Sequence, residues 1–150
     1  MSHITSFPEK FQDKLLQFEF ENVQTLDAGD SMIAYLDNVT GKEWAPTEAS
    51  VFQGQLKCLV VCTDSGSGSQ TVSKCQTTEN NFLFEYNGTT SVIAHNHEYF
   101  KHNDTNMNGT FAFTIIPATQ GFRITWTAPS GASGTTFHIK CVGKVLKIEL

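Results

Sequence analysis

Hydrophobic and polar residues alternate along most of the chain, which is the pattern of strands that bury one face. In the runs 109–116 and 122–128, aromatic or branched apolar residues alternate with threonine, alanine or arginine, and Trp126 falls on the apolar side. Further strands are expected at 32–36, 55–63, 81–85, 89–97 and 135–142. About seven or more short strands separated by turns predict an all-β chain, an antiparallel β-sandwich of immunoglobulin-like type.

The first residues follow a different period. Ser6-Phe7-Pro8-Glu9 fits a capping box with proline in the first helical turn. Phe7, Phe11 and Leu15 then share one helical face, and from Leu16 onward the pattern changes to alternation. We therefore expect a short N-terminal helix or turn over 7–15, followed by a strand that ends near residue 23.

Composition supports one β domain and argues against a nucleic-acid partner and against a transmembrane segment. The 150 residues suit a single domain, so 1–150 is expected to fold as one β-sandwich, and the 12 phenylalanines favour strands. The net charge is −5 and the chain has one arginine, Arg123, so it lacks the cations that neutralise nucleic-acid phosphates. No apolar stretch is long enough to form a transmembrane segment.

Four cysteines leave the redox state open. Cys58 and Cys62 share one face of the same expected strand, roughly 13 Å apart, too far for a disulfide. The Gly/Ser-rich loop 64–70 is expected to fold the next segment back and bring Cys75 near Cys62, which leaves Cys58 to pair with Cys141. The alternative is that all four are buried thiols, because the compartment decides between the two.

The compartment is read from the chain start and from the glycosylation sequons. The opening residues contain no positively charged segment followed by an apolar run, so as given the sequence carries no signal peptide. It is then either cytoplasmic or the mature form of a secreted protein, and we favour the extracellular reading. Candidate N-glycosylation sites occur at four Asn-x-Ser/Thr sequons, at Asn38, Asn87, Asn103 and Asn108.

One histidine cluster has the composition of a metal site. His95 and His97 are two residues apart on an expected strand, so both imidazoles face the same side, about 6.6 Å apart. His102 is a candidate third ligand for one divalent metal. The run approaches the first motif of a cupin, but the second motif does not follow. The alternative is that His95 is partly buried while the other two lie in solvent, with no cofactor bound.

The search for an enzyme nucleophile fails, so we expect no catalytic residues. No Gly-x-Ser-x-Gly elbow is present, and Cys58 and Cys62 face inward. Exposed aromatic side chains at turns or strand ends stack on sugar rings or enter membrane interfaces. The candidates for such a ligand face are Trp44, Tyr86, Tyr99 and Phe100, and the alternative is that they pack under loops.

Several short segments, in order along the chain, resemble the Reeler domain. The segment from Ile124 to Pro129 contains Trp-x-Ala-Pro, and a Gly-containing turn and the strand around Phe137 follow it. Earlier pieces similar to that family are 28–36, 52–61 and 92–95. The resemblance implies an extracellular immunoglobulin-like module of the kind found in cell-guidance, matrix and invertebrate defence proteins, and it transfers no catalytic residue.

Three functional hypotheses follow. The first is a non-enzymatic recognition module, acting in cell adhesion or innate defence, whose partner is a cell-surface or matrix protein or a glycan. The second is a metal-binding, cupin-like β-barrel that uses the histidine cluster. The third is a cytosolic lectin-like or lipid-binding protein.

Overall fold

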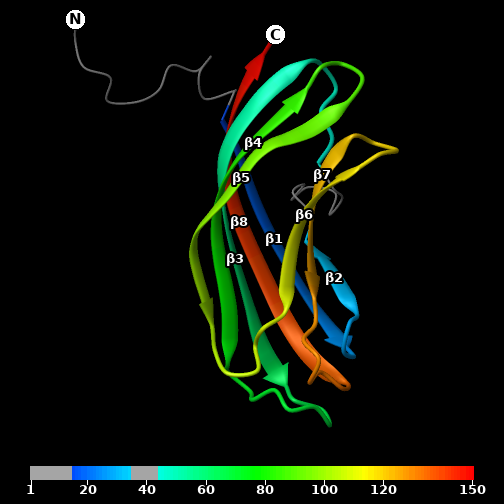
Figure 1. Ribbon diagram of the computed structural model, residues 1–150, viewed down its shortest axis with the longest axis vertical. Coiled ribbons are helices and arrows are strands. Elements are labelled where there is room, and N and C mark those ends of the chain that lie inside the picture. The colour runs from blue at the N-terminus through cyan, green and yellow to red at the C-terminus, as the bar shows by residue number, and fades with distance from the viewer. Residues whose placement is uncertain (1–14, 35–43) are drawn as a thin grey trace, which may run out of the picture.

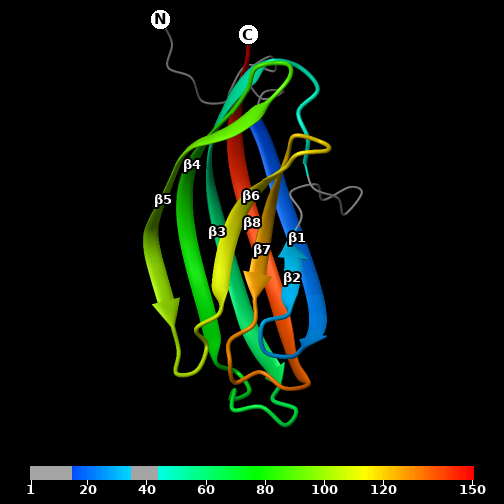
Figure 2. The same cartoon turned by 45° about the vertical axis from the view of Figure 1, so that its right-hand side comes forward.

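The computed structural model describes residues 15–34 and 44–150, which form two antiparallel β-sheets and no helix. Figures 1 and 2 show the long sheet on one side and the short sheet on the other. The five-stranded sheet has the order β1-β8-β3-β4-β5. Its strands are β1 (Leu15–Leu26), β3 (Ser50–Asp64), β4 (Cys75–Tyr86), β5 (Ser91–Asn103) and β8 (Thr135–Glu149). The three-stranded sheet has the order β2-β7-β6 and consists of β2 (Ser31–Ala34), β6 (Thr110–Ile116) and β7 (Gly121–Thr127).

The core lies between the two sheets and is built by the alternation seen in the sequence. In β3 the even-numbered residues from Phe52 to Cys62 are buried, and in β8 the odd-numbered residues from Thr135 to Val145 are buried. The short sheet contributes Met32, Phe122, Ile124 and Trp126 to the same core. Because side chains alternate between the faces of a strand, one buried face on each sheet produces this two-layer packing.

Trp126 points into the core between the two sheets, as the alternation in 122–128 predicts. Its side chain has no exposed area, and its ring meets the Phe137 ring edge-on at 4.8 Å between centroids. Pro129, which lacks an N–H for a strand ladder, lies two residues after the end of β7 and is buried. The prediction of an inward-facing tryptophan in a two-sheet core is therefore confirmed.

One expected strand is longer in the structure, and the expected N-terminal helix lies almost entirely outside the described residues. The strand expected at 81–85 is much longer, because β4 spans Cys75–Tyr86 and its first half is polar on both faces. The expected helix over 7–15 lies outside the described residues, except for Leu15, which begins β1. No helix in the described part of the chain is long and apolar enough to cross a membrane.

Candidate functional site

The first half of the inward face of β4 is polar, whereas most of the sandwich interior is apolar. Gln76, Thr78 and Asn80 point into the space between the sheets and are only 2%, 1% and 2% exposed. Further along the same face, Phe82 and Phe84 return to the apolar pattern. Buried polar side chains cost stability unless they are hydrogen-bonded, so we expect these three side chains to have hydrogen-bond partners.

Gln76 is held by both sheets. Its side-chain oxygen accepts a hydrogen bond from the Trp126 indole N–H at 2.9 Å, and its amide nitrogen donates to the Gly109 carbonyl at 2.6 Å. Gly109 lies against the Trp126 ring so closely that a Cβ atom there would be 2.5 Å from two ring carbons. The indole, the amide and the glycine therefore fix the spacing between β4 and the segment that leads into β6.

Gln76 and Thr78 continue into an open cleft between the edge of the long sheet and β6. This inter-sheet cleft has a volume of about 240 Å³. Its walls come from β4 and β5 on one side and from the start of β6 on the other. The lining residues are Gln76, Thr77, Thr78, Glu98, Lys101, Asn103, Asn108, Gly109, Thr110 and Phe111. The set combines one carboxylate, one ammonium, several amides and hydroxyls, and one aromatic ring.

At the inner end of the cleft, the Thr78 hydroxyl lies between two hydrogen-bond acceptors. The Thr78 hydroxyl lies 2.6 Å from Glu98 Oε2 and 2.9 Å from Asn80 Oδ1, so both oxygens are within reach of its single proton. Asn80 in turn donates to Asn96 Oδ1 at 3.1 Å. A hydroxyl carries one proton, so one of the two acceptors beside Thr78 is left for another donor. The cleft is therefore suited to a ligand that donates hydrogen bonds.

Beside the cleft, hydrogen bonds among Cys75, His102 and Asp104 join the end of β5 to the start of β4, and we call this group the polar clasp. The Asp104 carboxylate accepts a hydrogen bond from the Cys75 backbone N–H at 2.8 Å, while the Asp104 N–H donates to the Cys75 carbonyl at 2.9 Å. His102 Nε2 lies 3.0 Å from the other carboxylate oxygen. The hydrogen bond from Cys75 and then that from His102 hold the pKa of Asp104 at about 2. The clasp joins the first residue of β4 to the residue after β5.

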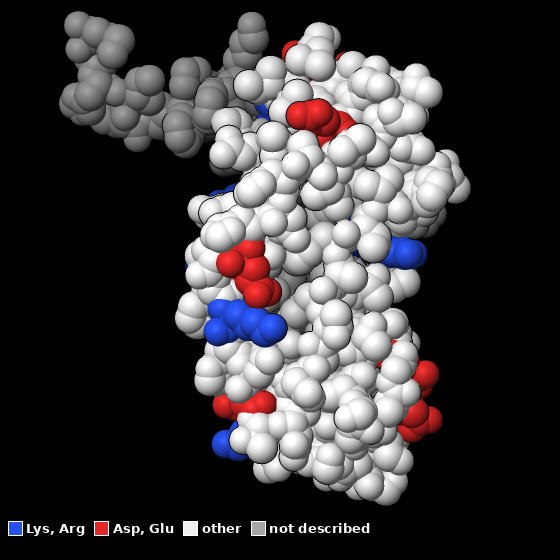
Figure 3. Space-filling model, in the orientation of Figure 1, with Lys and Arg blue, Asp and Glu red and all other residues white. Residues whose placement is uncertain are grey.

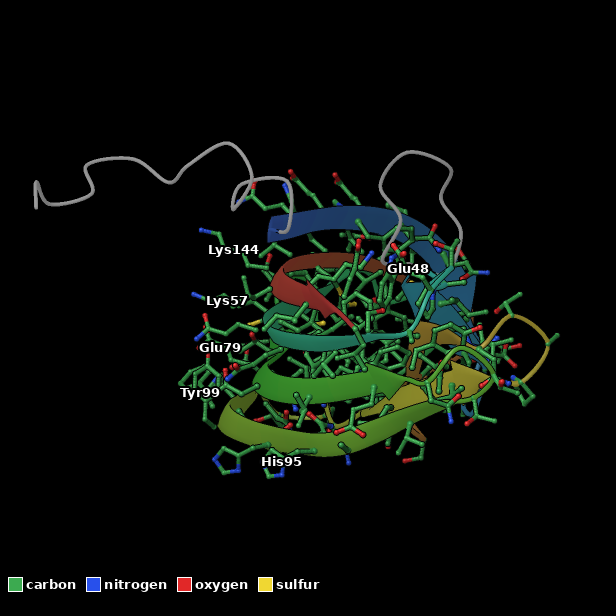
Figure 4. The ribbon with its side chains drawn as sticks, turned by 90° about the horizontal axis from the view of Figure 1, so that it is seen from above. Glu48, Lys57, Glu79, His95, Tyr99 and Lys144 are labelled. Carbon is green, nitrogen blue, oxygen red and sulfur yellow. The ribbon has the colours of Figure 1, made fainter. Side chains whose placement is uncertain are left out.

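The structure does not gather the three predicted metal ligands. His95 and His97 do share the outer face of β5, with ring centroids 6.3 Å apart, and Figure 4 shows His95 pointing away from the sandwich. His102 lies five residues further along the strand and faces Asp104 instead. Within the described residues, no three His, Cys, Asp or Glu side chains are placed to hold a metal ion. The structure therefore places His95 and His97 together and His102 apart from them, because the extended strand separates His102 from the pair, and metal binding by these histidines stays a prediction.

The structure does not bring Cys75 and Cys62 together as predicted. Cys75 lies opposite Val61 rather than Cys62, and this one-residue offset places the Cys75 and Cys62 side chains on opposite faces of the sheet. Burial raises the pKa of Cys75, and its hydrogen bond to Asp104 raises it further. Cys58 and Cys141 are directly opposite each other on β3 and β8, as the remaining pairing requires. All four are thiols in this structure.

Of the four aromatic side chains predicted to form a ligand face, two pack on the core and two remain exposed. Trp44 packs against Phe52 at 4.3 Å between ring centroids, and Tyr86 packs on the same core, so neither belongs to an open ligand face. Tyr99 and Phe100 remain largely exposed on β5. In Figure 4, Tyr99 lies on the outer face of the long sheet near Glu79, away from the inter-sheet cleft. The aromatic ring that does line the cleft is Phe111 of β6, which is partly buried against the core.

Two of the four sequons lie at the cleft. Asn103 and Asn108 are exposed and line it, whereas Asn87 is in the β4–β5 turn, where its side-chain oxygen accepts hydrogen bonds from the backbone of Thr89 and Thr90. Asn38 lies outside the described residues.

A second, wider hollow of about 440 Å³ lies on the outer face of the long sheet, over β1, β8 and β3. It is lined by Gln17, Glu19, Gln55, Lys57, Val142, Gly143 and Lys144. Lys57 pairs with Glu79 at 3.5 Å, and Glu19 pairs with Lys140 at 3.1 Å. The face in Figure 3 likewise shows charges of both signs, scattered and without a broad patch of one sign. We place the candidate site in the inter-sheet cleft, because only that hollow opens onto buried polar side chains.

Sequence reasoning missed most of the cleft. The signal that was present is the row of polar residues at 76, 78 and 80, which keeps the strand period but reverses its chemistry before Phe82. The packing of the two sheets, which brings 108–111 opposite β4 and β5, joins positions as far apart as Gln76 and Gly109, 33 residues along the chain, and has no local signature.

No protein-family model matches this chain, and no curated protein matches it. Among solved structures, the tailspike protein of Acinetobacter phage vB_ApiP_P1 is 11% identical with a TM-score of 0.41, over 99% of this chain and 24% of that chain. The tailspike protein of Acinetobacter baumannii phage AM24 is 5% identical with a TM-score of 0.39, over 94% and 30%. The chain thus spans less than a third of the length of either tailspike, and similarity this distant carries no argument about fold or function.

Proposed function

We propose that this protein is a non-enzymatic recognition module that binds a hydroxyl-rich ligand, a glycan unit, in the inter-sheet cleft. The observation that carries the proposal is the buried polar row Gln76, Thr78 and Asn80, which continues into an open cleft lined by Glu98 and amide side chains. Sugar hydroxyls donate and accept hydrogen bonds, so they can serve the acceptor that Thr78 leaves unmet.

The size and composition of the cleft support a small polar ligand. Pockets for drug-sized molecules run from about 300 to 1,000 Å³. At about 240 Å³ the cleft suits a single sugar residue at the end or branch of a chain. Phe111 supplies an aromatic ring of the kind that packs on the apolar side of sugars, next to Thr110.

The wider role follows as part of the same proposal. We propose an extracellular module of immunoglobulin-like, Reeler-like type, acting in adhesion or innate defence toward a cell-surface or matrix glycan. The inward Trp126 and the buried Pro129 after β7 support this kinship. Asn103 and Asn108 line the cleft, so a glycan attached to either would compete with the ligand for the same space.

The test is a glycan array followed by titration of the best sugar. Trp126 reports on the cleft through its hydrogen bond to Gln76, so we expect its fluorescence to change on binding, with Trp44→Phe removing the other indole. Glu98→Gln removes the carboxylate beside Thr78 and is expected to weaken binding about tenfold or more, since hydrogen bonds to a charged group contribute roughly 1.5–3 kcal/mol.

The matched control is Glu79→Gln, which makes the same chemical change on the outer face of the same sheet. It removes the ion pair with Lys57 and leaves the cleft intact, so binding is expected to stay within twofold. If Glu98→Gln and Glu79→Gln bind the sugar equally well, or if no glycan on the array is bound, the proposed site is wrong.

A further inference from the structure

Two thiols meet at the centre of the long sheet. Cys58 of β3 and Cys141 of β8 are direct cross-strand partners, and their sulfur atoms are 2.9 Å apart. Both side chains face the core and are only 1% and 2% exposed. Directly opposed residues of antiparallel strands have Cα atoms about 4.5 or 5.5 Å apart, and both spacings fall within the range that a disulfide spans.

No other pair of the four cysteines has this relation. Cys62 lies four residues from Cys58 on the same face, but its partner across the β3–β8 ladder is Phe137. Cys75 points to the other face, where its neighbour is Asp104. The register therefore selects one pair and leaves two cysteines without a sulfur partner.

We infer that Cys58 and Cys141 are joined by a disulfide in the mature protein and that Cys62 and Cys75 remain thiols. The bond links residues 83 positions apart and ties β3 to β8 in the middle of the sheet. The inference goes beyond glycan binding and does not depend on it, but it rests on the extracellular location in the proposed function, because disulfides persist in oxidising compartments.

The oxidant is a disulfide compound, either a small one such as glutathione disulfide or an exchange protein. The thiolate of one cysteine attacks a sulfur of the oxidant, forms a mixed disulfide and releases one oxidant thiolate. The second cysteine thiolate then attacks the protein sulfur of that mixed disulfide and releases the other oxidant thiolate. Two protein thiols and one oxidant disulfide thus become one protein disulfide and two oxidant thiols, which take up the two protons.

Burial decides when the bond forms. Burial in the core raises the pKa of Cys58 well above its usual range, and the neighbouring Cys141 raises it further, so the folded protein holds little thiolate there. The sulfurs are also out of reach of an oxidant once the short sheet covers them. The exchange therefore takes place while the chain folds, after β3 and β8 pair and before the two sheets close. The same burial then protects the bond from reductants.

The experiment refolds the full reduced chain in a mixture of reduced and oxidised glutathione. Iodoacetamide then blocks the remaining thiols before peptide mass mapping. We expect two blocked cysteines, Cys62 and Cys75, and one linked peptide pair that contains Cys58 and Cys141. Four blocked cysteines, or any other linked pair, would overturn the inference.

A control variant and a second measurement sharpen the result. Cys62→Ala removes a thiol from the same face of the same strand, and we expect it to retain the 58–141 link with one blocked cysteine. The folded, linked protein is expected to resist dithiothreitol at least tenfold longer than the same protein in denaturant. Equal reduction rates would refute protection by burial. Glycan binding is measured separately, so a failure of the disulfide and a failure of the proposed site are distinguishable.

Discussion

Replacing Trp126 with phenylalanine tests the link between the core and the candidate site. The indole N–H donates to Gln76 Oε1 at 2.9 Å, and Gln76 is 2% exposed, so the substitution leaves a buried acceptor without its partner. That loss costs about 1–3 kcal/mol. The smaller ring also removes about two buried carbon atoms, roughly another 1.6 kcal/mol at about 0.8 kcal/mol per buried CH₂. We expect the free energy of unfolding to fall by about 2.5–4.5 kcal/mol.

The assay is urea denaturation of the single variants Trp126→Phe and Gln76→Leu and of the double variant, with unchanged m-values required for the comparison. If the hydrogen bond couples the two side chains, the double variant is less destabilised than the sum of the singles by about 1 kcal/mol or more, because it leaves neither the indole N–H nor the Gln76 oxygen buried without its partner. The Gly109 carbonyl loses its donor equally in both variants that lack Gln76, so that loss cancels. Loss of less than about 0.5 kcal/mol in Trp126→Phe, or strict additivity, would refute the reasoning.

Three further predictions address the glycine contact, the clasp and the histidine pair. Gly109→Ala places a Cβ atom against the Trp126 ring, so we expect a lower melting temperature and weaker glycan binding, whereas Gly88→Ala in the exposed β4–β5 turn, where a Cβ meets nothing within 4 Å, should leave binding unchanged. The pKa of Asp104 is about 2, below its ordinary 3.8, so the stability that its charge provides is complete above about pH 4 and is lost as the pH falls through 2. Melting temperatures measured across this range should fall more steeply for the wild-type protein than for Asp104→Asn, and parallel curves would count against the clasp. His95 and His97 supply two imidazoles where a tight zinc site needs three or four ligands, so dialysed protein should retain less than about 0.1 equivalent of zinc, and a full equivalent would contradict this geometry.

The alternation of side chains predicts the sandwich well because burial of one face of a strand leaves a period-two pattern of apolar residues within that strand. The inward faces of β3, β7 and β8 follow directly from the period-two pattern, and Trp126 lies where that pattern places it. The same reasoning underestimates β4, since Gln76, Thr78 and Asn80 are buried although they are polar. A buried polar side chain is identified only when its hydrogen-bond partner is known, and the partner of Gln76 is 50 residues away.

For the histidines and cysteines too, the sequence predicts relations within one strand but not the register between strands. His95 and His97 were placed together correctly because their relation is local to one strand. Whether Cys75 meets Cys62 depends on a single residue of strand offset, and an offset of one reverses the face. Turn length and loop conformation set that offset, and the loop 64–74 gives no pattern from which it can be read.

In the described part of the chain, the start of β1 and the end of β8 lie at the same end of the long sheet. Leu15 pairs with Leu146, and Leu146 pairs with Gln53, whereas Gln76 in the cleft pairs with Val60, seven positions further along β3. At about 3.3 Å per residue, the cleft is roughly 23 Å from that end of the long sheet. Anything fused to Leu150 therefore projects away from the ligand opening, and several copies tethered through this end to a scaffold would present their openings outward together. Such an array would turn weak individual attachment into strong collective attachment to a surface that repeats the same sugar.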